Sequence, residues 1–190
     1  MMLKCCYSPA VVFILTLVLG AANATAQKYP PLQSVDAVDL SRYLGVWYQI
    51  ANTPNWFQKK CISDTSATYT RSNDGAGIEV LNACRTQKGI EEANGYARIV
   101  DHESNSKLEV SFFSILGWRP VWGDYWIIDL AEDYSWVIVG EPGRKYAWIL
   151  ARTQTLEPNL QQQLEQRLAD QGYDISSLQR LPHAAAPDTR

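Results

Sequence analysis

The feature that most constrains the fold is a series of short β-type segments separated by short polar turns, with no long helical segment between them. Asp74-Gly75 at the tip of one turn is a typical hairpin signal. A parallel crossover needs a dozen or more residues, usually a helix, so successive strands are expected to pair antiparallel. The eight expected strands are residues 46–52, 66–71, 77–83, 95–101, 107–113, 125–130, 136–139 and 146–152.

Eight antiparallel strands fit either a sandwich or a closed barrel. Uniform short hairpins without a long return connection favour the barrel. We therefore predict an all-β fold, an eight-stranded antiparallel up-and-down barrel whose interior can hold one small ligand. A C-terminal helix over about residues 158–171 carries an apolar stripe of Leu160, Leu164 and Leu168, which we expect to pack on the outside of the barrel. A helix that binds a partner is the alternative.

Residues 1–26 have the layout of a secretory signal peptide. Lys4 is the only charge there, residues 10–19 are apolar, and Ala24-Thr-Ala26 offers a cleavage site of small residues. The apolar run is short for a membrane span, although an uncleaved anchor is the alternative. No cysteine directly follows the run. We expect an exported protein, periplasmic or secreted and not lipid-anchored, with a barrel domain over residues 27–182 and a disordered tail over 183–190.

Two cysteines, Cys61 and Cys84, remain after removal of the signal peptide. In an oxidising compartment the default is a disulfide between them. A reactive or metal-binding thiol is the alternative, but the only histidines, His102 and His183, do not lie near either cysteine in the sequence. The net charge of −3 provides no basic surplus, so we expect no nucleic-acid partner. The sequence does not indicate an oligomeric state.

Enzymatic constellations are absent from the sequence pattern. His102 lies in a polar turn with no paired nucleophile, and the adjacent Glu132 and Asp133 would face opposite sides of a strand. Gly75-Ala-Gly77 lies in a hairpin and opens no helix, unlike a phosphate-binding loop. We therefore expect no catalytic residue, no metal and no cofactor.

Several motifs carry a family resemblance. Gly45-Val-Trp47-Tyr resembles the Gly-x-Trp-Tyr signature of lipocalins, and residues 148–153 (Trp-Ile-Leu-Ala-Arg-Thr) resemble a segment of bacterial and apolipoprotein-D-like lipocalins. Residues 107–113 and 122–126 are similar to the same subgroup, and the resemblance covers residues 40–181. It implies that Trp47 plugs the closed end of the barrel and that Arg152 lies across its indole, with Gly45 as part of this structural signature.

The resemblance departs from the family pattern at one turn. Residues 131–134 read Ala-Glu-Asp-Tyr, where many lipocalins have Thr-Asp-Tyr. A receptor contact at this turn is therefore not implied.

Alternate connections of an up-and-down barrel lie at opposite ends. The connections 53–65, 84–94, 114–124 and 140–145 would share the end opposite Trp47, which brings Cys61 and Cys84 to one end and supports their pairing. This end also carries unusually many apolar side chains for loops. They either pack on one another or form a rim that admits apolar ligands or touches a membrane: Trp56, Phe57, Ile115, Leu116, Trp118 and Trp122.

Strand alternation predicts the ligand-binding residues. Tyr69, Val110, Phe112 and Trp148 are expected to line the interior and Trp122 the mouth, although a one-residue slip in register would invert a strand. The resemblance implies non-covalent binding, storage or transport of a small hydrophobic ligand, of the fatty acid or lysophospholipid class, in cell-envelope lipid handling. The alternatives are a lipocalin-fold enzyme acting on a lipid and an interaction scaffold with a filled barrel.

Overall fold

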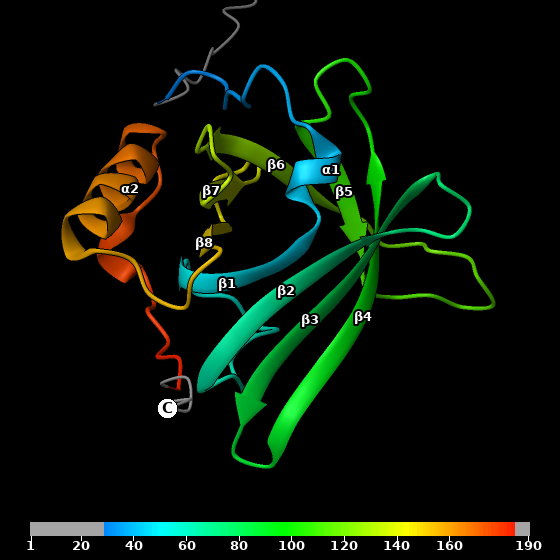
Figure 1. Cartoon of the computed structure of the whole chain (residues 1–190), viewed down its shortest axis with the longest axis horizontal. Helices are drawn as coiled ribbons and strands as arrows, with labels where there is room; N and C mark the ends of the chain where they lie inside the picture. Colours follow the sequence, from blue (N-terminus) through cyan, green and yellow to red (C-terminus); the bar gives the residue numbers. More distant parts are fainter. Residues whose placement is uncertain (1–28, 185–190) are drawn as a thin grey trace, which may run out of the picture.

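Eight antiparallel strands pair in sequence order and close into a barrel in the computed structural model, which describes residues 29–184 (Figure 1). Closure comes from pairing of β1 with both β2 and β8. The predicted all-β barrel is confirmed, whereas the predicted signal peptide lies outside the described residues. The strands are β1 (Gly45–Asn52), β2 (Ser63–Arg71), β3 (Gly77–Thr86), β4 (Gly89–Ile99), β5 (Lys107–Ser111), β6 (Gly123–Leu130), β7 (Trp136–Gly140) and β8 (Ala147–Ala151).

The β3–β4 hairpin is longer than predicted. Pairing continues to Thr86 opposite Gly89, so the expected connection over residues 84–94 is wrong and only a tight turn separates the strands. Glu92, Ala93 and Asn94 are all exposed. Because this part of β4 buries neither face, its sequence lacks the alternation that marks a half-buried strand.

A second apolar core lies outside the barrel, beneath helix α2 (Pro158–Asp170). Leu164 and Leu168 are fully buried there, and α2 flanks β7 and β8 in Figure 1. The predicted helix and its position on the outside of the barrel are confirmed. The tight approach of Tyr173 requires Gly140, since a Cβ there would lie 2.2 Å from the Tyr173 hydroxyl oxygen.

The closed end is built around Trp47, whose side chain is fully buried. The guanidinium carbon of Arg152 lies 3.8 Å from the centre of the Trp47 ring, which is the stacking that the resemblance implied. Arg152 also donates hydrogen bonds to four main-chain carbonyls, those of residues 42, 43, 44 and 46. Gly45 has a φ of +94°, a left-handed conformation that favours glycine, directly beside this guanidinium.

A short helix, α1 (Leu40–Tyr43), covers the same end. It places Tyr43 against Trp47, with their ring centres 5.2 Å apart, and Trp47 donates from its indole nitrogen to the Tyr43 carbonyl. The Tyr43 and Tyr69 hydroxyl oxygens lie 2.6 Å and 2.9 Å from that of Tyr125. We refer to Tyr43, Tyr69 and Tyr125 as the tyrosine cluster.

Burial raises the pKa of every phenol in the tyrosine cluster. The pKa of Tyr69 rises to about 12, with burial as the main cause and the hydrogen bond to Tyr125 opposing it. The pKa values of Tyr43 and Tyr125 rise well above their usual value, again chiefly through burial. All three phenols are therefore neutral at physiological pH.

The chain after α2 runs back along the barrel. His183 lies 2.9 Å from the Gln49 carbonyl and packs edge-on against Tyr48, and the Ala184 amide donates to Asp64. Contacts with the barrel thus extend beyond the domain boundary predicted at residue 182, while residues 185–190 lie outside the described part. None of the helices within residues 29–184 is long and apolar enough to span a membrane.

Substitution of Arg152 tests the closed end. We expect Arg152→Ala to lower the free energy of unfolding by about 2–3 kcal/mol, because it removes charge-assisted hydrogen bonds and leaves main-chain carbonyls without a donor. Trp47→Ala should cost more, about 3–5 kcal/mol. Urea denaturation measures both. Arg167→Ala, which removes an exposed ion pair with Asp129, is the control and should cost less than about 1 kcal/mol. Equal losses for Arg152→Ala and Arg167→Ala would contradict the assignment.

The raised pKa of Tyr69 predicts a loss of stability at alkaline pH. Between its unfolded pKa near 10 and its folded pKa of about 12, the unfolded chain ionises first, so stability is fully present below pH 10 and falls as pH rises. Tyr69→Phe should remove about 1 kcal/mol of the decline between pH 9 and pH 11. Urea denaturation at pH 7, 9 and 11 measures the free energy of unfolding of the parent and of the variant. The difference between the two proteins at pH 7 gives the cost of the substitution that does not depend on pH, and it is subtracted. A decline of the same size in both proteins would refute it.

Candidate ligand-binding cavity

The barrel encloses a cavity of about 930 Å³ that reaches from the tyrosine cluster to the end opposite Trp47. This volume is at the upper end of the range for small-molecule sites. The tyrosine cluster forms the floor. The wall above it is apolar and comes from β2, β3, β4, β5 and β8, with the side chains of Ala67, Ile78, Val80, Ala97, Leu108 and Leu150.

All five residues predicted to bind ligand line this cavity: Tyr69, Val110, Phe112, Trp122 and Trp148. On β8, Trp148 and Leu150 face the interior while Ile149 packs in the outer core, so the predicted register holds there. Contact with a ligand remains a prediction for each of them.

Phe112 and Trp122 lie outside the strands, at the rim. β5 ends at Ser111, one residue before Phe112, so this residue is not on a strand as predicted. Its ring lies over Gly95, where a Cβ would approach the ring to 2.6 Å. Trp122 is held by the Arg98 guanidinium, 4.2 Å from the ring centre, and donates to the Arg119 carbonyl.

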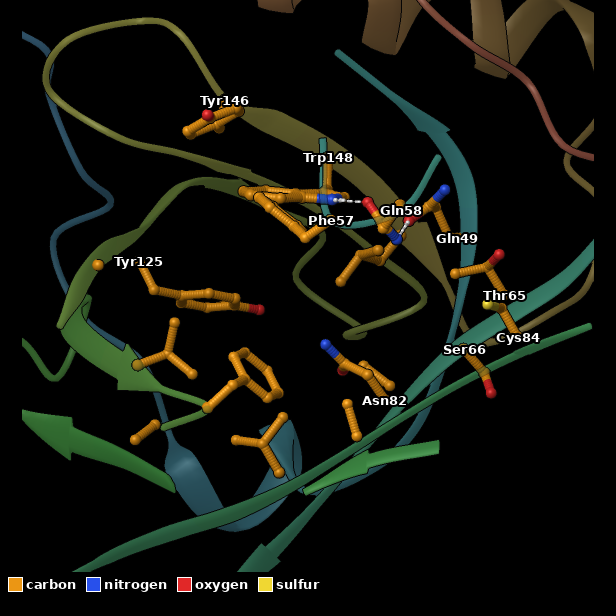
Figure 2. Close-up of a pocket in the computed structure, with 18 of the residues that line it drawn as sticks. Gln49, Phe57, Gln58, Thr65, Ser66, Asn82, Cys84, Tyr125, Tyr146 and Trp148 are labelled. Carbon is orange, nitrogen blue, oxygen red and sulfur yellow. Dashed lines mark hydrogen bonds between the residues drawn. The ribbon is translucent and has the colours of Figure 1, made fainter. Parts of the chain in front are cut away.

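A polar strip on one wall was missed by the sequence analysis. The Trp148 indole donates to the Gln58 amide oxygen at 3.1 Å, and Gln58 donates in turn to Gln49 at 2.8 Å (Figure 2). Asn55 also donates to the Gln58 oxygen, at 2.6 Å. Gln49 could have been found, because it lies two residues after Trp47 on the same strand and must share its inward face. Gln58 lies in a loop, where alternation predicts nothing.

The loop between β1 and β2 (residues 53–62) carries Gln58 and Phe57 into the cavity wall. The Phe57 ring centre lies 5.7 Å from that of Tyr146 and 6.4 Å from that of Trp148. The predicted Cys61–Cys84 disulfide is present and ties this loop to β3, which excludes a free reactive thiol at either position. In the chain-entropy description such a cross-link contributes about 3 kcal/mol.

Charged side chains line only the mouth end of the cavity within the described part of the chain. Lys60 forms an ion pair with Glu91, and both belong to the hairpin and loop at the mouth. Burial raises the pKa of Asp124, and the nearby carboxylates of Glu109 and Glu141 add to the shift. Residues 29–184 contain no cluster of three or more potential metal-ligating side chains. The arrangement suits a ligand with a charged or polar end at the mouth and an apolar body inside.

The loop between β5 and β6 (residues 112–122) projects from the barrel in Figure 1, and several of its residues line the cavity. We call it the apolar loop, because it exposes Phe112, Phe113, Ile115, Leu116, Trp118 and Val121. Leu116 is fully exposed, at the tip of a turn closed by main-chain hydrogen bonds between Ile115 and Trp118. Trp118 is 67% exposed. Of the predicted rim, Trp56 and Phe57 pack edge-on, with ring centres 5.7 Å apart, yet both stay exposed to solvent, as do Ile115, Leu116 and Trp118.

Comparison with known proteins identifies the family. Residues 38–183 match the family described as lipocalin-like domain. The chain is 38% identical to temperature-induced lipocalin-1 of Arabidopsis thaliana over 161 residues, covering 82% of this chain and 85% of that protein. It is 33% identical to outer membrane lipoprotein Blc of Escherichia coli K12, covering 75% and 77%, and 30% identical to apolipoprotein D of Mus musculus, covering 84% and 83%.

The structural comparison agrees with this match. The fold is similar to that of insecticyanin from the tobacco hornworm Manduca sexta, with a TM-score of 0.65, coverage of 82% and 86%, and 22% sequence identity, which shows the fold alone. Together with the Trp47–Arg152 closure and the deep cavity, the matched residues show that this chain belongs to the lipocalin family.

Proposed function

We propose that this protein binds a small hydrophobic ligand of the fatty acid or lysophospholipid class non-covalently, and stores or transports it in cell-envelope lipid handling. The observation that carries the proposal is the 930 Å³ cavity, with apolar walls and with its lining charges at the mouth. Membership in the lipocalin family supports the binding of a small hydrophobic ligand. The specific lipid class comes from the family resemblance, and the charged mouth above apolar cavity walls supports it.

The orientation follows from the cost of burying charge. A carboxylate or phosphate loses its hydration when it is buried, so it belongs at the mouth, where water reaches it. The mouth holds Lys60 and Lys145 but also the carboxylates of Glu91, Glu92, Asp124 and Glu141, so hydration rather than a net positive charge favours this orientation. The acyl chain then lies along Val110 and Trp148 towards the floor. About ten buried methylenes contribute roughly 8 kcal/mol before the cost of immobilising the ligand, which is consistent with micromolar binding.

The alternatives are an enzyme acting on a lipid and a scaffold with a filled barrel. A scaffold is disfavoured, because an interior filled by side chains would not leave a cavity of this volume. We infer a non-catalytic protein, since the polar strip of Gln49, Gln58 and Asn55 holds amides rather than a nucleophile paired with a base. The disulfide supports export to the periplasm or beyond. The absence of a lipid anchor stays a prediction from the sequence alone.

We further propose that the apolar loop touches a lipid bilayer when ligand is exchanged. The loop is continuous with the cavity, because its residues Phe113, Val121 and Trp122 also line the mouth. Its tip exposes Leu116 and Trp118 to solvent at the same end. Insertion of this tip would bring the mouth to the acyl chains, so that a lipid enters without crossing water.

Substitution of Trp148 tests the binding site. We expect titration with a fatty acid to give a saturable change in tryptophan fluorescence, with a dissociation constant raised about tenfold or more in Trp148→Ala, because a large apolar wall is lost. Trp136→Ala is the matched control, since Trp136 lies outside the cavity and packs in the outer core. Equal affinity of Trp148→Ala and the parent would refute the lining assignment, and failure of every fatty acid and lysophospholipid to bind would refute the function.

Substitution of the loop tip tests the bilayer contact. The double variant Leu116→Asp/Trp118→Asp should reduce co-sedimentation with phosphatidylcholine vesicles at least about fivefold, because both apolar side chains leave the bilayer. Val100→Asp is the control, as Val100 is similarly exposed, at 55%, but follows β4 at the closed end. If the parent does not sediment with vesicles, or if the double variant sediments equally well, the contact is wrong.

A further inference from the structure

The floor of the cavity holds three hydroxyl groups in an otherwise apolar surrounding. Tyr43 comes from α1, Tyr69 from β2 and Tyr125 from β6, and all three line the cavity. Figure 2 shows the Tyr125 ring reaching from β6 into the interior with its hydroxyl oxygen at the tip. The nearest apolar wall is formed by Ile78, Val80, Ala97 and Leu108, which belong to the same buried core as Tyr43 and Tyr69.

The tyrosine cluster forms an open chain of hydrogen bonds. Tyr125 is hydrogen-bonded to Tyr43 at 2.6 Å and to Tyr69 at 2.9 Å. The three hydroxyl groups have no other hydrogen-bond partner among residues 29–184. Each phenol carries one proton, so the cluster has three donors. Two hydrogen bonds use two protons. Whichever way the hydroxyls rotate, one donor is left over.

A leftover donor is costly where it is buried. A closed triangle would use all three protons, but no hydrogen bond joins Tyr43 to Tyr69 directly. Three phenylalanines would fill the same volume with no polar group at all. A bound apolar chain that excludes water from the floor would leave this donor without an acceptor, at a cost of about 1–3 kcal/mol. A ligand that places its own acceptor there avoids that cost.

The chemistry of the acceptor follows from the surroundings. The phenols are neutral and can donate a hydrogen bond but cannot neutralise a negative charge. The cations that line the cavity, Lys60 and Lys145, belong to the loops at the mouth. The Arg152 guanidinium lies near Tyr43, but it does not line the cavity and donates to main-chain carbonyls instead. A carboxylate on the floor would therefore have no cation in direct contact, whereas an uncharged carbonyl oxygen needs only the donor that is already there.

We propose that the tyrosine cluster is a second polar subsite, which binds an uncharged carbonyl oxygen at the deep end of the ligand. This inference rests on the proposed function and narrows it. The preferred ligand has a charged or polar head at the mouth, an apolar middle, and a ketone or ester carbonyl near the far end of its chain. A plain fatty acid leaves the floor donor unpaired and is the weaker partner.

The test compares two series of ligands. Fatty acids of 10 to 16 carbons are titrated against acids of the same length that carry a ketone on the last carbon but one. The ratio of the two dissociation constants is measured in the parent protein and in Tyr43→Phe/Tyr69→Phe/Tyr125→Phe, which removes every phenol donor and keeps the rings. At the chain length that places the ketone on the floor, the parent should favour the ketone about tenfold more strongly than the triple variant does, as expected for one buried hydrogen bond.

Two further measurements make the result decisive. Tyr173→Phe is the control, since Tyr173 is a buried phenol outside the cavity that bonds the Glu141 main chain, and it should leave the ratio unchanged. The carbonyl stretch of the bound ketone, measured with a ¹³C label in the parent protein, should lie at lower wavenumber than in a hydrocarbon solvent. This measurement requires no variant, so an unshifted stretch excludes the hydrogen bond even if the triple variant does not fold.

The outcomes separate this inference from the proposed function. If plain fatty acids bind but the ratio is the same in the parent and the triple variant at every length, the deep subsite is wrong and the carrier function stands. A ketone stretch equal to that in hydrocarbon would likewise overturn the deep subsite alone. If neither series binds, the proposed function and this inference both fail.

Discussion

The Arg152 guanidinium stacks on the Trp47 ring, 3.8 Å from its centre, at the closed end of the barrel. Trp47 lies on β1 and Arg152 directly follows β8, so the pair joins the first and last strands at the point where the barrel closes. The same guanidinium donates to main-chain carbonyls between residues 42 and 46, which fixes the end of α1 to the start of β1. Because α1 is held there, Tyr43 is placed under the barrel and the cavity has a floor. A planar, always-charged guanidinium can serve both roles at once, whereas an ammonium group cannot.

The two ends of the barrel differ in which groups they bury and which they expose. At the closed end the polar groups are buried and bond to one another, as in the Arg152 carbonyl contacts and the tyrosine cluster. At the open end apolar side chains are exposed to solvent instead, as the apolar loop shows with Leu116 and Trp118. The exposed apolar side chains of the apolar loop and the third hydroxyl donor of the tyrosine cluster could both make further favourable interactions. They lie at the two ends of one cavity. We therefore assign the apolar loop to ligand entry and the tyrosine cluster to the deep end of the bound ligand.

The sequence carried enough information for the topology and for much of the lining. Short hairpins allow so few connections between strands that an up-and-down barrel follows. Strand alternation predicted that Trp148 faces the interior, and Trp148 does line the cavity. The prediction failed where neither face of a strand is buried, at the outer part of β4, because periodicity reports burial rather than pairing. It also failed for contacts that depend on register between distant segments. Tyr43, Tyr69 and Tyr125 are far apart in the chain, and only the closed barrel brings their hydroxyls together.

The Cys61–Cys84 disulfide links the shape of the binding site to the stability of its least regular part. Loops owe their positions to few interactions, so a loop that forms a cavity wall needs a constraint of its own. Here one end of the loop continues from β1, where Gln49 bonds to Gln58, and the other end is tied to β3 through Cys84, which itself lines the cavity. Phe57 and Gln58 are thereby held against Trp148 from both sides. The disulfide is therefore part of the cavity wall as well as a cross-link of the chain.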